Sequence, residues 1–264
     1  MRDDRLASIP DAGTLPHRIA DRSRWSIATL VLLCLFASAP DMAGEFRLSH
    51  QGIVKLGQEY GEFARQRIVS WQALIRTGSD LSDLQKLQRV NHFFNALEFV
   101  NDVDHWGKKD YWATPLETLI SDGGDCEDFS IAKYFTLLEM GIPADRMRLT
   151  YVKALKLNQA HMVLTYFPAP DADPLVLDNL YQEIRPASQR DDLLPVYSFN
   201  GEGLWLAKKQ FKDSRPVGRA DRLAPWRELI ARISDEMGPL PARDYAIDSG
   251  NSYAAPGSVG PINQ

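Results

Sequence analysis

The sequence predicts a protein of the α+β class. Three observations predict it: apolar residues recur at helical spacing up to about residue 140, short apolar segments typical of strands follow from about residue 149, and no internal repeat is evident. A chain whose strands follow its helices, instead of alternating with them, belongs to this class.

Helical spacing defines the first part of the folded region. The helices expected from it cover residues 53–75, 80–97 and 126–140. The first is one uninterrupted apolar stripe that Gly78 ends, and Gly141 stands in the usual stop position of the third. Residues 100–124 contain aromatic, acidic and glycine residues without a clean period, which predicts an ordered loop.

Strands are expected in the second part. The segments typical of strands cover residues 149–153, 161–167, 175–179, 196–200 and 204–207. The turn-rich sequence PAPDAD joins the second of these segments to the third, so we expect the two to form an antiparallel hairpin. A closing helix is expected over residues 225–237.

The first residues of the chain have the composition of an export signal. Residues 1–24 are polar and rich in arginine, and residues 25–39 form an uncharged apolar run that is shorter than the roughly 20 residues of a membrane span. We therefore expect a leader over residues 1–43, a folded domain over 44–238 and a disordered tail over 239–264. If the leader is cleaved, the exported protein does not span a membrane; an uncleaved leader that anchors the protein is the alternative.

The charge balance argues against nucleic acid as a partner. The net charge is −5, and no run rich in Lys and Arg occurs. Mild acidity is compatible with a divalent cation but does not by itself indicate one.

Cys126 is the candidate nucleophile. The other cysteine, Cys34, lies in the expected leader, so the mature chain has no partner for an internal disulfide. The N-terminus of a helix favours an anion, which lowers the pKa of a thiol and supplies the reactive thiolate. A buried structural cysteine at a helix start is the alternative interpretation.

His161 and Asp178 complete a candidate Cys-His-Asp triad with Cys126. This chemistry needs a thiolate, a base that shuttles its proton, and a carboxylate that fixes the imidazole tautomer. His161 begins one strand of the expected hairpin and Asp178 ends the other, so the two side chains are expected to be neighbours. Taken singly, His161 could be a strand-edge histidine bonded to backbone, and Asp178 a turn carboxylate.

From about Leu81 to Trp205 the chain resembles the bacterial transglutaminase-like cysteine proteinases, and more narrowly the LapG-type periplasmic proteases. The motifs that carry the resemblance are VNDVDHWGKKDYWATPLETL, GGDCEDFSIAKYFTLLEMGIP, AHMVLTYF and PLVLDNL. The resemblance implies a papain/transglutaminase-like fold, with the nucleophile helix packed on an antiparallel β-sheet. It also implies that Cys126 is the nucleophile, His161 the general base and acid, and Asp178 the orienting residue.

The resemblance implies a biological role as well. LapG-type proteases cut a large surface adhesin near its N-terminus at a paired-alanine site, which releases the adhesin from the outer membrane and disperses biofilm. An inner-membrane receptor for cyclic di-GMP sequesters and so inhibits the protease. A periplasmic location is expected on the same basis.

Acidic residues around Cys126 create an electrostatic conflict, because uncompensated negative charge raises the pKa of a thiol. A bound cation would remove the conflict, and carboxylate oxygens suit Ca²⁺. LapG-type proteases are calcium-dependent, and Asp125 and Glu127 match their acidic residues. Asn101 and Asp104 are the further ligands we expect. Alternatively, Asp125 and Glu127 only cap the helix.

Two other functions keep the same residues. One is acyl transfer to an amine, as in transglutaminases, through the same acyl-thioester. The other is a non-catalytic calcium-binding interaction module with an inert thiol, against which the intact triad weighs. Arg185, Arg190 and Asp192 lie in a further stretch typical of the family, and we assign them surface or packing roles.

Overall fold

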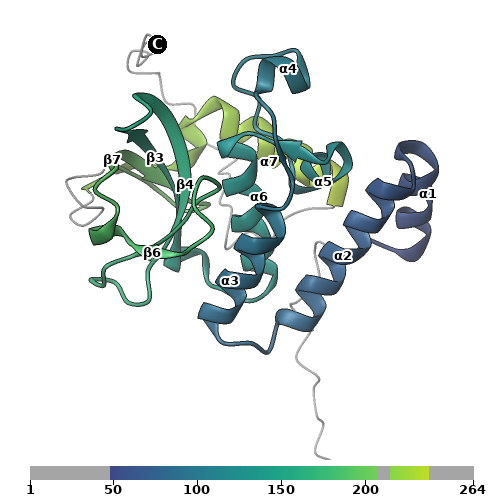
Figure 1. Cartoon of the computed structure of the whole chain (residues 1–264), viewed down its shortest axis with the longest axis horizontal. Helices are drawn as coiled ribbons and strands as arrows, with labels where there is room; N and C mark the ends of the chain where they lie inside the picture. Colours follow the sequence, from purple (N-terminus) through teal and green to yellow (C-terminus); the bar gives the residue numbers. More distant parts are fainter. Residues whose placement is uncertain (1–47, 207–214, 238–264) are drawn as a thin grey trace, which may run out of the picture. The chain divides into compact units, whose positions relative to one another are not determined.

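The structure, a computed structural model, describes residues 48–206 and 215–237 (Figure 1). The leader expected over residues 1–43 and the tail expected over 239–264 lie outside these described residues. None of the helices in the described stretches combines the length and the hydropathy that a membrane span requires.

The described residues form a helical part followed by a sheet, so the expected α+β class is confirmed. The helices are α1 (His50–Tyr60), α2 (Glu62–Gly78), α3 (Asp83–Phe94), α4 (Asp102–Trp106), α5 (Pro115–Ser121), α6 (Cys126–Glu139) and α7 (Ala224–Met237). The sheet strands are β3 (Met147–Ala154), β4 (Gln159–Tyr166), β5 (Leu175–Leu177), β6 (Arg185–Pro186), β7 (Leu193–Phe199), β8 (Leu204–Leu206) and β9 (Arg215–Gly218). A separate pair, β1 (Glu98–Phe99) and β2 (Gly123–Gly124), is parallel.

The sheet has seven strands in the order β6-β5-β4-β3-β7-β8-β9, and every neighbouring pair is antiparallel. The expected hairpin is confirmed, because β4 pairs with β5 and Leu164 lies opposite Leu177. This register brings the beginning of β4 close to the residues that follow β5. The hairpin therefore sets the position of His161 relative to Asp178.

The single helix expected over residues 53–75 is wrong. Gly61 separates α1 from α2 with a φ of 93°, in the left-handed region that glycine adopts at little cost, and its N–H closes α1 on the Gly57 carbonyl. Tyr60 and Phe63, which continue the apolar stripe across this break, are both exposed.

The ordered loop expected over residues 100–124 is also wrong, because it contains α4 and α5. The start of α5 is a capping box: Thr114 Oγ1 accepts from the Glu117 N–H at 3.1 Å, and Glu117 accepts from the Thr114 N–H at 2.7 Å. Pro115 occupies the first helical position, where its missing N–H costs nothing. The sequence Thr-Pro-x-Glu is typical of a helix start and could have predicted α5. The helix has only 7 residues, however, which is too few for a helical period of apolar residues to be recognised.

Helix α6 runs through the core between the other helices and the sheet (Figure 1). Most of its side chains are buried, as expected for a helix that is covered on all sides. Trp71 of α2 donates from Nε1 to Thr136 Oγ1 at 2.8 Å, and Lys86 of α3 donates to the Met140 carbonyl at 2.6 Å. Both contacts hold the C-terminal end of α6 against the helices α2 and α3.

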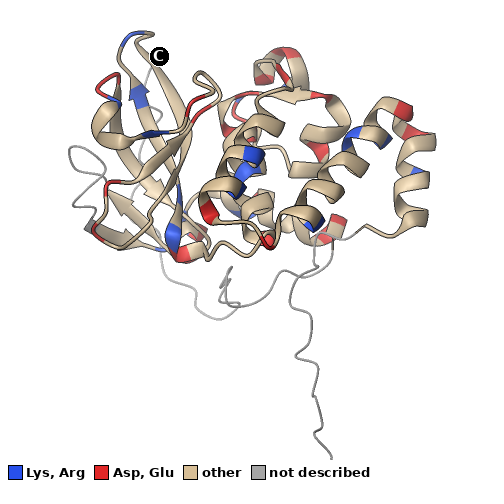
Figure 2. Cartoon of the chain, turned by 60° about the horizontal axis from the view of Figure 1, so that its bottom comes forward, with Lys and Arg blue, Asp and Glu red and all other residues tan. Residues whose placement is uncertain are grey.

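Charged side chains are distributed over both the helices and the strands, with acidic and basic residues interspersed (Figure 2). The strands and closing helix expected after residue 190 are present as β7, β8 and α7.

Candidate active site

Cys126 is the first residue of α6, directly after the N-cap residue Asp125. Asp125 Oδ1 accepts from the Glu127 N–H at 3.1 Å, and Asp128 Oδ2 accepts from the Asp125 N–H at 3.2 Å, which forms a capping box. Asp128 Oδ1 also accepts from the Ala113 N–H at 2.7 Å. The cap therefore ties the nucleophile to the segment that leads into α5.

The two glycines before the cap are required by close packing. In the β1–β2 pair, a Cβ at Gly123 would lie 2.5 Å from the Glu98 carbonyl oxygen, and a Cβ at Gly124 would lie 2.5 Å from Asp128 Oδ2. Side-chain atoms cannot approach so closely. The Gly-Gly sequence thus lets the nucleophile loop pack against β1 and against its own capping residue.

His161 and Asp178 form a buried pair, as the hairpin predicts. His161 Nε2 lies 2.8 Å from Asp178 Oδ1, which also accepts from the Leu180 N–H at 2.9 Å. Burial alone would raise the pKa of Asp178, but the hydrogen bonds from His161, Leu180 and Arg190 outweigh it and lower that pKa to about 2. Asp178 is therefore an ionised carboxylate that holds the imidazole.

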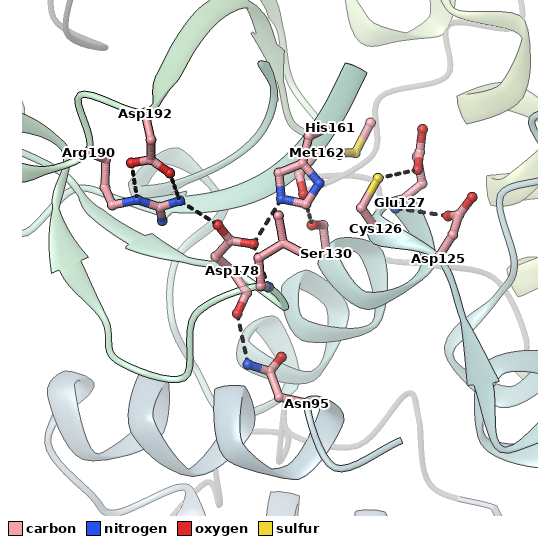
Figure 3. Close-up of polar contacts among 11 residues, drawn as sticks. Asn95, Asp125, Cys126, Glu127, Ser130, His161, Met162, Asp178, Arg190 and Asp192 are labelled. Atoms are coloured by element: carbon pink, nitrogen blue, oxygen red, sulfur yellow. Dashed lines mark hydrogen bonds and ion pairs between the residues drawn. The ribbon is translucent and has the colours of Figure 1, made fainter. Parts of the chain in front are cut away.

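Packing of α6 on β4 brings Cys126 to this pair. Ser130 Oγ donates to the Met162 carbonyl at 3.1 Å, and the Met162 N–H bonds to the Cys126 thiol. Figure 3 shows Cys126 beside His161, with the ring nitrogen that does not face Asp178 on the thiol side. The structure thus brings together all three residues of the predicted triad.

The surroundings of the Cys126 thiol favour its protonated form. Cys126 Sγ donates to Glu127 Oε2 at 2.7 Å. Burial raises the pKa of the thiol well above its usual value, and the negative charges of Glu127 and Asp125 raise it further, opposed by the Met162 N–H. The electrostatic conflict expected around Cys126 is therefore present, and something must offset it before a thiolate forms.

Two overlapping groups of potential metal ligands meet at the start of α6. Asp125, Cys126 and Glu127 form one, Asp102 joins Asp125 and Asp128 in the other, and the ligand atoms of each lie within 4.8 Å of one another. Burial, followed by the charge of Asp125, raises the pKa of Asp102 to about 6.

The position of Asp102 departs from the ligand set expected. Asp104 is exposed and belongs to neither group of acidic and cysteine ligands, and Asn101 is exposed, whereas Asp102, which lies between them, is buried. Asp102 Oδ2 accepts from the Tyr111 N–H at 2.5 Å, while Oδ1 is buried without a hydrogen-bond partner in the described part of the chain. The sequence pointed to residues 101–104 as a source of ligands. Because no helix was expected there, the sequence could not show that Asp102 is the residue that faces inward.

The donor set fits a calcium ion. Asp125 belongs to both groups and offers carboxylate oxygens beside Glu127 in one and beside Asp102 in the other, and such oxygens are the hard ligands that Ca²⁺ prefers. The unpartnered oxygen of Asp102 and the raised pKa of both Asp102 and Asp125 are what an acidic site shows when its compensating charge is missing. Asp125 thus serves both as helix cap and as a candidate ligand.

Sequence reasoning also missed residues that contact Asp178. Arg190, to which we assigned a surface or packing role, is buried, and its Nη2 lies 2.7 Å from Asp178 Oδ2. Asn95 of α3 donates from Nδ2 to the Asp178 carbonyl at 2.8 Å. Arg185, by contrast, forms an accessible pair with Glu183, as a surface role predicts.

Comparison with known proteins gives a consistent result. A family model described as bacterial transglutaminase-like cysteine proteinase BTLCP matches residues 67–205. A solved structure of Legionella pneumophila LapG is similar at 44% identity and a TM-score of 0.62, and the alignment covers 70% of this chain and 98% of that one. The calcium-bound form of that protein matches at 44% identity, a TM-score of 0.61 and coverages of 70% and 99%. The EGTA-treated form matches at 45% identity, a TM-score of 0.63 and coverages of 70% and 98%. Among curated proteins none matches.

Proposed function

Because the chain belongs to the bacterial transglutaminase-like cysteine proteinases, and is therefore a cysteine peptidase, we propose that it is a calcium-dependent endopeptidase that uses Cys126, His161 and Asp178. The observation that carries the proposal is the buried His161–Asp178 pair beside a thiol at the start of α6. A module that only bound calcium would have no use for this arrangement.

The proposed reaction follows from the contacts of the three residues. His161 Nδ1 takes the proton of the Cys126 thiol, while Asp178 accepts the Nε2–H and stabilises the imidazolium. The thiolate attacks the scissile carbonyl carbon, and the imidazolium returns the proton to the leaving amine, which leaves an acyl-thioester. His161 then removes a proton from water, whose attack releases the acid and regenerates the thiol.

Calcium dependence is proposed from the acidic groups and from the calcium-bound form of the similar LapG structure. Asp102, Asp125 and Glu127 would hold the ion. When bound, it supplies positive charge that offsets these carboxylates and competes with the thiol for Glu127, so that the thiolate becomes easier to form. The N-terminus of α6 then favours the thiolate without opposition from the charges of Asp125 and Glu127.

The substrate and setting are proposed from the resemblance to LapG-type proteases. We infer that the protein acts in the periplasm on the N-terminal region of a large surface adhesin, at a paired-alanine site, and that the cut releases the adhesin and disperses biofilm. An inner-membrane cyclic di-GMP receptor is the inhibitory partner in this proposal. The similarity to LapG over 70% of the chain supports it.

The test combines residues 40–264, as wild type and as Cys126→Ala, with the N-terminal region of the candidate adhesin. Intact mass is recorded with Ca²⁺ and with EGTA. We expect the wild type to cleave at one paired-alanine site when Ca²⁺ is present and not when EGTA is present. Cys126→Ala is expected not to cleave in either condition. Cleavage that survives EGTA would remove the calcium dependence. Absence of cleavage by the folded wild type in both conditions would favour acyl transfer to an amine or a non-catalytic binding role.

A further inference from the structure

Arg190 continues the proposed triad into a chain of alternating charges that is buried as far as Arg190 and partly exposed at Asp192 (Figure 3). Its Nη2 lies 2.7 Å from Asp178 Oδ2 and 2.9 Å from Asp192 Oδ2, and its Nε lies 2.9 Å from Asp192 Oδ1. The Arg190 side chain is 2% exposed and that of Asp178 0%, so solvent does not screen their contact. The order His161, Asp178, Arg190, Asp192 alternates an imidazole or cation with a carboxylate.

The two oxygens of Asp178 have separate partners. Oδ1 takes His161 Nε2 and the Leu180 N–H, and Oδ2 takes Arg190. Asp178 lies one residue beyond the end of β5, and its carboxylate is held by the Leu180 N–H on Oδ1 and by Arg190 on Oδ2. The contact with Arg190 therefore fixes the oxygen that does not face the imidazole, while the Leu180 N–H binds the one that does.

Arg190 is itself fixed from two sides. Asp192 binds Nε and Nη2 together, which sets the plane of the guanidinium, and the Tyr181 ring lies 4.6 Å from its Cζ. The Asp192 carbonyl accepts from the Leu155 N–H at 2.8 Å, which ties this segment to the end of β3. The guanidinium is thus a rigid support for the carboxylate.

We propose that Arg190 is a positioning residue of the active site, which holds Asp178 Oδ2 so that Oδ1 stays directed at His161, while Asp192 holds Arg190. The inference rests on the proposed triad. A buried ion pair adds little net stability compared with apolar packing, so stability alone does not account for this chain of charges. Misplacement of a catalytic group by about 1 Å can cost ~100-fold in rate, which makes such a support worthwhile.

Alkylation of Cys126 by iodoacetamide at neutral pH with saturating CaCl₂ measures the reactivity of the thiol without any substrate. We expect Arg190→Gln to slow it about 10- to 100-fold. Arg190→Lys keeps the charge but loses the planar fork, so it recovers part of the rate. Arg185→Gln, a matched change in the accessible Arg185–Glu183 pair, leaves the rate at the wild-type value. A wild-type rate for folded Arg190→Gln overturns the proposal.

A double-mutant cycle separates positioning from general destabilisation. If Arg190 acts through Asp178, Arg190→Gln adds no further loss in an Asp178→Asn background. An equal loss in both backgrounds overturns the proposal, because a purely structural effect does not depend on Asp178. Near-UV circular dichroism confirms folding, and if Arg190→Gln does not fold, Arg190→Lys is compared in the same two backgrounds. Because the assay uses no adhesin, failure of the cleavage experiment leaves this result interpretable.

Discussion

The charges of Asp125 and Glu127 make the Cys126 thiolate harder to form, yet the start of α6 gathers further acidic residues beside them. Asp125 and Asp128 are accounted for by the helix cap, which uses both side chains. Asp102 is different, because one of its oxygens is buried without a hydrogen-bond partner in the described residues. A buried carboxylate oxygen without a partner destabilises the fold, so we expect Asp102 to bind a cation.

Asp102→Asn and Asp104→Asn form a matched pair of changes within α4. We expect Ca²⁺ at about 100 times its Kd to stabilise the wild type by about 2.7 kcal/mol, which raises Tm by roughly 5–10 °C. Asp104→Asn keeps this shift, since Asp104 is exposed and outside both groups, and Asp102→Asn loses most of it. Differential scanning fluorimetry with CaCl₂ and EGTA measures the shift. If Asp104→Asn loses the calcium-dependent shift in Tm and Asp102→Asn keeps it, Asp104 is the ligand and Asp102 is not.

The contact between His161 and Asp178 could be predicted from sequence because both residues lie near the ends of paired elements. His161 lies near the start of β4 and Asp178 directly follows β5, so their closeness follows from the antiparallel pairing of these two strands. Arg190 and Asp102 could not be identified in this way. Their roles depend on which way a side chain faces in an irregular or very short element, and no period in the sequence carries that information.

At the scale of elements, the start of α6 depends on the two glycines. We expect Gly124→Ala to destabilise the protein by about 1–3 kcal/mol, because the new methyl group displaces Asp128 from the cap. Gly52→Ala in α1 is the control: its Cβ meets only Ser49 Oγ at 3.4 Å, and alanine favours the helix. Urea unfolding of both variants measures the difference. If Gly124→Ala is as stable as Gly52→Ala, the segment before α6 accommodates the methyl group without loss of stability.

Helix α7 contributes a carboxyl group with an altered proton affinity. Burial raises the pKa of Glu236 to about 7, although Thr114 Oγ1 donates to it at 2.8 Å. The pKa in the unfolded chain is near 4.5. The folded state therefore binds the proton more tightly, and stability falls as pH rises from about 4.5 to about 7.

Glu236→Gln removes this pH dependence because the amide stays neutral. At pH 8 we expect the variant to be more stable than the wild type by on the order of 1 kcal/mol, and at pH 4 the difference disappears. Glu228→Gln, an exposed change in the same helix, serves as control. Urea unfolding at the two pH values measures both, and a difference that persists at pH 4 contradicts the assignment.

The elements themselves were predictable to different degrees. Helix α6 and strands β3 to β5 follow from apolar runs with clear stops. The break at Gly61 was missed because the apolar period continues across it on exposed residues, and a period alone does not show burial. Helices α4 and α5 are shorter than the window in which a helical period can be detected.

At the scale of the whole molecule, one aromatic cluster joins the helices to the sheet. Trp226 of α7 stacks on Phe135 of α6 with ring centroids 5.9 Å apart, and meets Phe199 of β7 edge-on at 5.3 Å. All three side chains are buried. Loss of this cluster therefore weakens α6, α7 and β7 together.

Trp226→Ala is expected to cost about 3–5 kcal/mol, because it leaves a large cavity at this junction. Phe63→Ala, which removes an aromatic ring that is 78% exposed, changes stability by less than about 0.5 kcal/mol. Thermal unfolding followed by far- and near-UV circular dichroism measures both. Two separate transitions in Trp226→Ala would show that the sheet and the helices unfold independently.

The strand order β6-β5-β4-β3-β7-β8-β9 has a consequence for how the protein is made. The β3–β4 hairpin is central, and every later strand pairs with the free edge of one that precedes it in the chain. When the chain emerges from its N-terminal end, the sheet can therefore grow outward from this hairpin without opening a pair already formed. Residues 126 to 192, which carry the nucleophile and the whole charge chain, emerge before β7, β8, β9 and α7.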